Sequence, residues 1–146
     1  MNQQSDFDIY VKPTFFIDSD SPRIQAYARN LCRGISSERD QAIALYYGVR
    51  DDIRYDPYNF ENNRNFIRAS SVLEKKAGYC VAKAVLLAAV ARAQSIPARL
   101  GFADVQNHLV TERLKSFMET NLFVYHGYVE LYLEGRWVKA TPAFNG

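Results

Sequence analysis

Two stretches near the start of the chain repeat apolar residues at the three-to-four-residue spacing of an amphipathic helix. The first begins at the Ser-Pro pair 21–22, where serine can cap the helix and proline suits its first position, and we expect it to end at Gly34. The second is capped by Ser36 or Ser37 and runs to Ile53 with its charged residues turned to water. Both patterns predict helices that pack one face against a core.

Residues 80–94 predict a helix of a different kind. This segment is rich in alanine and leucine, and its only charged residues are Lys83 and Arg92. A helix that is apolar almost all round is a buried one. Gly78 precedes the segment, where we expect it to end the preceding structure, and Pro97 follows the helix. The pattern therefore predicts a central buried helix.

Beyond Pro97 the apolar period changes from that of a helix to two, the spacing of a strand. Residues 98–105 alternate loosely. Residues 122–142 contain tyrosine and glutamate alternating with valine and leucine, followed by a Glu-Gly turn at 134–135, and they predict a hairpin. Helices, then a buried helix, then an antiparallel sheet define an α+β fold, and the length suits a single domain over 1–146.

The remaining segments give weaker patterns. Residues 5–18 suggest an edge strand or a packed extended arm, and residues 54–68 suggest a loop whose four aromatic side chains either pack on the domain or line a cleft. The Ser-x-x-Glu pattern at 71–74 resembles a capping box and predicts a short helix that Gly78 ends. Residues 108–121 predict a helix or an ordered insertion.

Composition and charge exclude several classes of partner. The net charge of +2 and the lack of a basic run argue against nucleic acid and against an anionic membrane surface. The polar, acidic N-terminus is unlike a secretion signal, and no segment approaches the ~20 apolar residues of a membrane span, so we expect a cytoplasmic location. Cys32 and Cys80 are then expected to be free thiols, and their spacing relative to the histidines predicts no metal site.

Cys80 is placed where a reactive thiol would be. A thiol in the first turn of a helix lies at the positive end of the helix dipole, near unpaired backbone N–H groups, and both effects favour the nucleophilic thiolate. Most free cysteines are instead buried as small apolar residues, so position alone leaves both interpretations open. Cys32 lies near the C-terminal end of the first predicted helix, where the dipole disfavours a thiolate, and we interpret it as an inert core residue.

His126 is the candidate base. It opens a strand-like run 46 residues after Cys80, and an imidazole can take the proton of a thiol and hold the resulting ion pair. A lone histidine in a strand is more often packed or exposed than catalytic. His108, in the loop after the first predicted strand, is the competing candidate.

Four ordered motifs resemble the transglutaminase-like superfamily. They are Gly-x-Cys before the apolar helix, Ile-Pro-Ala-Arg after it, then His-Gly-Tyr-Val-Glu-Leu, then Trp-Val, and together they cover residues 69–145, with Tyr55 also typical. The resemblance implies a papain-like fold, in which the cysteine helix packs against an antiparallel sheet that carries the other two members of a catalytic triad. It also implies that Cys80 is the nucleophile and His126 the general base.

The third triad position departs from the family pattern. Thr141 stands before Pro142 where the resemblance implies an aspartate. A threonine hydroxyl can accept a hydrogen bond from the imidazole, but it cannot stabilise an imidazolium as a carboxylate does. Replacing the acid by a neutral group costs a serine triad about 10⁴ in rate, whereas papain-like proteases use asparagine there, so Asn145 is an alternative orienter. Relatives commonly continue past the position of Gly146, so we expect this chain to lack a sheet edge or an acidic partner.

The resemblance also implies an oxyanion hole made by the backbone N–H of Cys80 and one further donor that the sequence does not identify. Lys83 lies one turn into the helix. It is expected either to favour the thiolate electrostatically or to be a solvated lysine at the mouth of a cleft.

The resulting hypothesis is a cysteine enzyme that acts on a peptide or protein amide through a thioester, without a metal or organic cofactor. Water or an amine would resolve the thioester, and the absence of calcium-site carboxylate clusters favours water. The alternative is an inactive scaffold that uses the cleft to bind a peptide or protein, which the missing acid favours.

Overall fold

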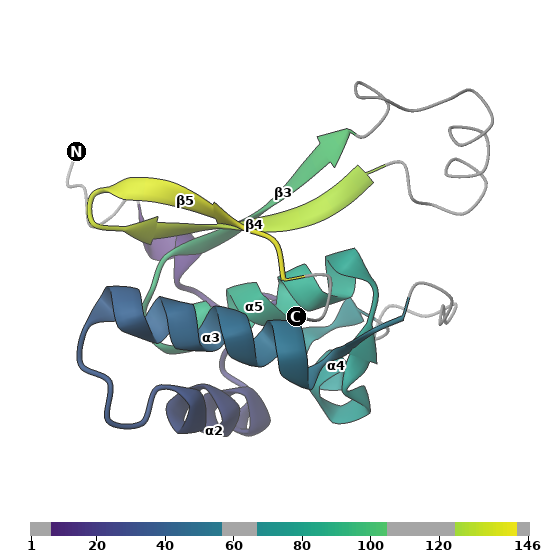
Figure 1. The fold of residues 1–146 in the computed structure, drawn as a ribbon, viewed down its shortest axis with the longest axis horizontal. Coiled ribbons are helices and arrows are strands. Elements are labelled where there is room, and N and C mark those ends of the chain that lie inside the picture. Colours follow the sequence, from purple (N-terminus) through teal and green to yellow (C-terminus); the bar gives the residue numbers. More distant parts are fainter. Residues whose placement is uncertain (1–6, 57–66, 105–124, 143–146) are drawn as a thin grey trace.

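The structure is a computed structural model that describes residues 7–56, 67–104 and 125–142 of the chain (Figure 1). A three-stranded sheet lies over a layer of helices. In chain order the elements are η1 (Asp8–Tyr10), α2 (Pro22–Leu31), α3 (Glu38–Asp52), β1 (Arg54–Tyr55), α4 (Ala69–Lys75), β2 (Ala77–Gly78), α5 (Cys80–Ala93), β3 (Ala98–Asp104), β4 (Tyr125–Leu133) and β5 (Arg136–Ala140).

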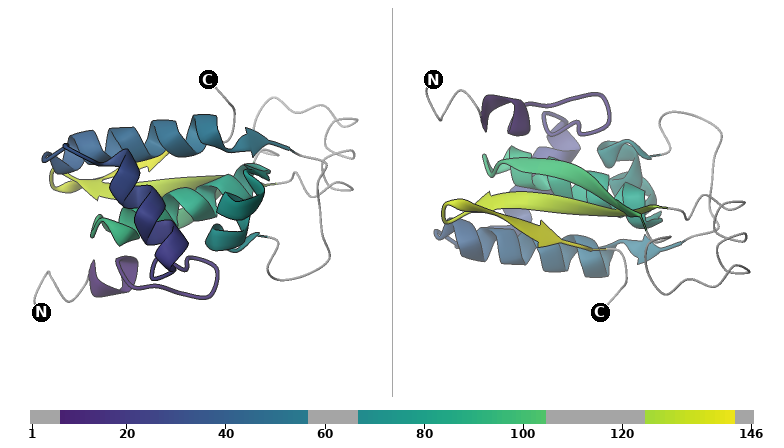
Figure 2. Two further views of the ribbon diagram at one scale, coloured as in Figure 1. Left: turned by 90° about the horizontal axis from the view of Figure 1, so that it is seen from below. Right: turned by 90° about the horizontal axis from the view of Figure 1, so that it is seen from above.

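The main sheet has the order β3-β4-β5, with both pairs antiparallel. Helix α5 packs beneath β3 and β4, and β5 lies on the side nearest α3 (Figure 2). Helices α2, α3 and α4 pack around α5. The predicted α+β architecture, with N-terminal helices and a buried cysteine-bearing helix on an antiparallel sheet, is confirmed; that residues 1–146 form a single domain stays a prediction.

Helix α5 is the centre of the core, as its composition predicts. Every residue from Ala82 to Arg92 is buried. Each large apolar side chain buried this completely stabilises the fold by about 1.5–3 kcal/mol relative to exposure. Leu86, Leu87 and Val90 are all fully shielded, so the helix contributes to the core on every face.

The two predicted surface helices begin where their capping residues indicate. Pro22 is the first residue of α2, and the Ser37 hydroxyl accepts a hydrogen bond from the Asp40 N–H (3.3 Å) at the start of α3. Helix α2 ends at Leu31, three residues earlier than the position of Gly34 suggests. In α2 the local pattern therefore gives the start of the helix more closely than its end.

The capping box predicted at residues 71–74 is wrong. Helix α4 begins at Ala69, and its second residue, Ser70, donates its N–H to the Asp18 carboxylate (3.1 Å). A side chain more than fifty residues earlier therefore replaces the local cap. The helix ends through Lys76, whose φ is 57°, and Gly78 lies in β2 rather than ending the helix.

The N-terminal arm, residues 7–19, is packed on the domain, but the edge strand predicted there is wrong because the arm contains the 3-10 helix η1. The rings of Phe7 and Tyr10 lie 6.1 and 5.2 Å from that of Trp137 on the sheet. Residues 57–66 and the predicted insertion at 108–121 lie outside the described residues.

Candidate active site

Cys80 is the first residue of α5, as the sequence predicts. The preceding residue, Tyr79, is the N-cap and has extended backbone angles (φ −86°, ψ −175°), so the chain turns sharply into the helix at the thiol. The N–H groups of the first helical residues have no partner within a helix and point toward its N-terminal end. Cys80 is only 4% exposed, which places its sulfur within the folded structure rather than on the surface.

A short parallel strand pair fixes the chain just before Cys80. Tyr55 in β1 pairs with Gly78 in β2, and the Asp56 N–H donates to the Gly78 carbonyl (3.0 Å). A Cβ atom at Gly78 would lie 2.8 Å from the Ala82 Cβ, so only glycine lets β2 run this close to α5. The glycine of the Gly-x-Cys motif therefore sets the approach of the chain to the helix, a role that its position in the sequence did not reveal.

Strand β4 crosses the first turn of α5 almost backbone to backbone. A Cβ atom at Gly127 would lie 3.1 Å from the Cα and 3.4 Å from the N of Val81. Gly127 and Val81 directly follow His126 and Cys80, so this contact brings the backbones of the two predicted catalytic residues together. His126 lies in β4, opposite Ala103 of β3.

Thr141 immediately follows β5, the strand that pairs with β4. Its neighbour Ala140 lies opposite Val129, three residues after His126. The Thr141 side chain is half-buried, and its carbonyl accepts a hydrogen bond from the Tyr46 hydroxyl of α3 (3.3 Å). The backbone at the third triad position is therefore fixed by both the sheet and a helix; the competing candidates His108 and Asn145 lie outside the described residues.

Lys83 is not a solvated lysine at a cleft mouth, and that prediction is wrong. Its side chain is fully buried, and its Nζ donates a hydrogen bond to the Arg50 carbonyl (2.9 Å) in the last turn of α3. The carbonyls of a helix's last turn lack partners within the helix and attract cations. Burial lowers the pKa of Lys83 to about 8, the nearby Asp51 carboxylate works in the opposite direction, and Arg50 adds to the lowering. An electrostatic effect of Lys83 on Cys80 stays a prediction.

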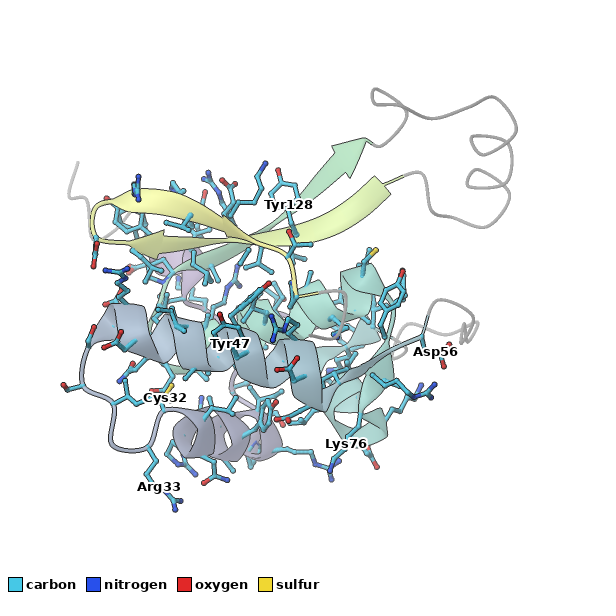
Figure 3. All side chains as sticks on the ribbon, viewed as in Figure 1. Cys32, Arg33, Tyr47, Asp56, Lys76 and Tyr128 are labelled. Carbon is cyan, nitrogen blue, oxygen red and sulfur yellow. The ribbon has the colours of Figure 1, made fainter. Side chains whose placement is uncertain are left out.

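Cys32 is a buried core residue at the end of α2, where the chain turns toward α3 (Figure 3). Burial raises the pKa of its thiol, which keeps it protonated and unreactive. Both cysteines are free thiols. The structure therefore places Cys32 in the core, as its position in the sequence predicts.

Tyr79 is a feature of the site that the sequence analysis missed. Burial raises the pKa of its phenol, and the electrostatic effect of the adjacent Cys80 adds to the rise. The phenol therefore stays protonated beside Cys80 and has a proton to donate in a hydrogen bond. Its place directly before the cysteine is the one sequence signal that could have indicated it.

Two further findings apply to the described part of the chain. Within residues 7–56, 67–104 and 125–142, no three His, Cys, Asp or Glu side chains are grouped so that they could hold a metal ion. None of the helices in those same ranges has the length and apolar character needed to cross a membrane.

A cysteine at the start of a buried helix, beneath an antiparallel sheet whose central strand carries a histidine, defines a papain-like architecture. The profile of the transglutaminase-like superfamily matches residues 25–142, and the chain belongs to that superfamily. The resemblance that the four sequence motifs indicate is thereby confirmed.

Solved structures share the fold at low sequence identity. The "putative cysteine protease" from Cytophaga hutchinsonii superposes with a TM-score of 0.74 at 20% identity, covering 97% of this chain and 43% of that protein. The periplasmic domain of TgpA from Pseudomonas aeruginosa superposes with a TM-score of 0.60 at 22% identity, covering 83% of this chain and 42% of that domain. This chain therefore spans less than half the length of either structure. No curated protein matches the chain.

Proposed function

We propose that this protein is a transglutaminase-like cysteine enzyme that cleaves a peptide or protein amide through a thioester on Cys80. The close contact of Gly127 with Val81 is the observation that carries the proposal, because it brings the strand of His126 against the first turn of the cysteine helix. The scaffold of a cysteine enzyme and the family membership support it further.

In the proposed reaction His126 takes the proton of the Cys80 thiol, and the sulfur attacks the amide carbon. The backbone N–H of Cys80 donates to the developing oxyanion, and the protonated Tyr79 phenol is a candidate second donor. The C–N bond then breaks as His126 gives its proton to the leaving amine, and the thioester forms. Water attacks the thioester carbonyl, His126 accepts its proton and returns one to the sulfur, and the carboxylic acid leaves.

Alkylation of the thiols tests whether Cys80 is a nucleophile. We expect iodoacetamide at pH 6.5 to label the wild type at Cys80 at least about tenfold faster than it labels glutathione, because a thiolate reacts and a thiol does not. Cys80→Ala should abolish the fast labelling, and His126→Ala should slow it. Cys32→Ala is the matched control and should leave it unchanged. A Cys80 that reacts no faster than glutathione would contradict the proposal.

The second candidate function is an inactive scaffold that binds a peptide or protein at the former active site around Cys80. The neutral side chain at position 141 favours it, because no carboxylate stabilises an imidazolium there. Slow labelling of Cys80 together with saturable binding of a peptide that Cys80→Ala does not affect would support this function over the enzyme.

Hydrolysis rather than transamidation is the proposed outcome. A fluorogenic peptide amide incubated with excess dansylcadaverine distinguishes the two, because only transamidation incorporates the dansyl amine into the product. The cytoplasmic location predicted from the N-terminus also stays a proposal, and fractionation of cells that produce the protein tests it.

A further inference from the structure

An apolar groove lies between α3 and the hairpin β4–β5, and Thr141 lines one part of it. Helix α5 packs beneath β3 and β4, and α3 is the helix that lies nearest β5 (Figure 2). One cavity there has a volume of about 430 Å³, and a neighbouring one of about 320 Å³ continues it toward the hairpin turn. The two share Ile43, Leu133 and Val138, so they form one continuous groove.

The groove exposes to water apolar side chains of a kind that a folded protein normally buries. On α3, Ile43 is 43% exposed and Tyr47 is 49% exposed. On the sheet, Val138 and Ala140 of β5 form the opposite wall beside Leu131. Contiguous apolar surface of this kind, rimmed by charges, is typical of a site that binds another chain.

The edge of β5 along this groove has free backbone groups. The two-residue turn at 134–135, with φ values of 52° and 83°, is of the type that closes on a hydrogen-bonded pair, here Leu133 and Arg136. Pairs alternate along an antiparallel ladder, so Trp137 and Lys139 direct their N–H and C=O groups away from β4. Within the described residues, those groups form no hydrogen bond.

A hydrogen bond of Thr141 shows independently which element the edge of β5 faces. Thr141 is two residues beyond Lys139, so its carbonyl lies on the same outward side of the strand. That carbonyl accepts the hydrogen bond from the Tyr46 hydroxyl of α3. The free edge of β5 therefore faces α3 across the groove.

The charged residues that line the groove indicate which kind of peptide it binds. At the hairpin end, the described residues that line the groove include two exposed arginines, Arg39 of α3 and Arg136 of β5, and one acid, Glu134. At the other end, the Arg50 guanidinium is already paired with Asp51 and lies 4.6 Å from the centre of the Tyr47 ring. The surplus positive charge at the hairpin end complements an acidic residue.

We propose that this groove binds an extended peptide, which adds as a strand to the β5 edge, places every second, apolar side chain against α3, and sets an acidic residue between Arg39 and Arg136. Main-chain hydrogen bonds supply affinity in this mode of recognition, and alternate side chains supply specificity. Since β5 has five residues, the bound segment spans about 17 Å. The site does not depend on the chemistry of Cys80.

Panning a phage-displayed library of random heptapeptides on the full chain tests the proposal. We expect enriched peptides to alternate apolar residues and to carry Asp or Glu at one end. The affinity of the most enriched peptide, labelled with fluorescein, is then measured by fluorescence anisotropy. Lys139→Pro should weaken it about tenfold, since proline removes an outward N–H and is tolerated on an edge strand. Val138→Pro is unsuitable because its N–H pairs with β4.

Side-chain variants separate the apolar and charged parts of the site. Ile43→Asp and Tyr47→Asp should each weaken binding about tenfold, and they keep the test valid if Lys139→Pro does not fold. The double variant Arg39→Glu, Arg136→Glu should lose the preference for acidic peptides. Ile9→Asp, at another exposed apolar position, and Cys80→Ala are the controls and should bind as the wild type does.

Three results would overturn the proposal. The first is the absence of enrichment over a library panned on Ile43→Asp. The second is binding that the groove variants leave unchanged or that favours basic peptides. The third is sedimentation of the wild type as a dimer that Lys139→Pro dissociates, which would make a second copy of the chain the occupant.

Discussion

Lys83 shows how one buried charge is accommodated in an otherwise apolar helix. On folding, its ammonium group loses its hydration and gains a hydrogen bond to a carbonyl at the negative, C-terminal end of α3. That bond compensates only part of the lost hydration. The lowered pKa of about 8 expresses the remaining cost. The lysine therefore ties α3 to the turn that follows Cys80, and its contribution to stability depends on pH.

The free energy of unfolding should rise with pH between about 8 and 10.5. In this window the unfolded chain holds a proton on Lys83 that the folded protein has released, so raising the pH favours folding. The release of this proton raises the free energy of unfolding by about 3 kcal/mol in full. That gain is present above pH 10.5 and is lost as the pH falls through 8. Urea unfolding from pH 7 to 10.5 measures it. Lys83→Met should flatten the curve relative to Lys12→Met, an exposed control, and parallel curves for the two variants would exclude this linkage.

Thr141 is the residue on which the strength of the proposed triad depends. Thr141→Asp should accelerate iodoacetamide labelling of Cys80 at pH 6 by about tenfold, because a carboxylate stabilises the imidazolium that accompanies the thiolate. The backbone contact with Tyr46 does not involve the substituted side chain, so folding should be retained. Thr141→Asn is the neutral control. If Asn145→Ala slows labelling and no change at position 141 affects it, Asn145 is the orienter instead.

At the scale of elements, the contact of β4 with α5 positions the site. With a larger residue at Gly127 the two elements would have to move apart slightly, because a methyl group there would lie 3.1 Å from the Val81 Cα. Helix and strand are thus held closer together than an ordinary side-chain contact allows. A shift of the strand would move His126 relative to Cys80.

Gly127→Ala should separate the two elements. Overpacking of this kind costs about 1–3 kcal/mol, and we expect urea unfolding to show that loss together with labelling of Cys80 slowed by about tenfold. Gly34→Ala is the matched control: a Cβ there meets no atom within 4 Å, but its φ of +77° costs about 1 kcal/mol. The control should lose stability and keep its labelling rate. Equal rates in the two variants would show that the contact does not position the histidine.

The elements also show what a sequence can predict. Helix α5 and the β4–β5 hairpin were predictable because composition and period two are local signals. The cap of α4 was not, because Asp18 supplies it from the N-terminal arm. The pair β1–β2 has two residues in each strand, too few to show any period.

The same distinction holds for the candidate site. Ordered motifs indicate Cys80 and His126 as candidates, whereas the burial of Lys83 depends on α3, which contacts it only after folding. The close approach at Gly127 could not be predicted for the same reason. A motif can therefore indicate candidate residues, but not the contacts that position them.

At the scale of the whole molecule, Arg92 joins three parts of the fold. Its guanidinium donates two hydrogen bonds to the Ala98 carbonyl (3.1 and 2.8 Å) and one to the Lys12 carbonyl (2.8 Å). Those bonds link α5 to the start of β3 and to the N-terminal arm. The arm in turn covers the outer face of the sheet at Trp137, whose ring also carries the Arg99 guanidinium at 3.9 Å.

Arg92→Met should release the arm before the rest of the domain unfolds. Leaving the buried Ala98 carbonyl without its donor costs about 1–3 kcal/mol, and loss of the part-buried bond to the Lys12 carbonyl adds about 1 kcal/mol. Trp137 is the only tryptophan, so its emission should shift to longer wavelength at urea concentrations below the main transition seen by circular dichroism. Arg29→Met, at an exposed position, should show a single transition, and a single transition in Arg92→Met would contradict the role assigned to this residue.

The path of the arm also bears on descent. The family profile begins at residue 25, whereas the partners of Arg92 and Trp137 on the arm lie before it. In a relative without the arm, an arginine at position 92 would keep its two bonds to the Ala98 carbonyl but would lose the bond to the Lys12 carbonyl. Relatives that lack the arm should therefore accept other residues at position 92 more readily than relatives that have it.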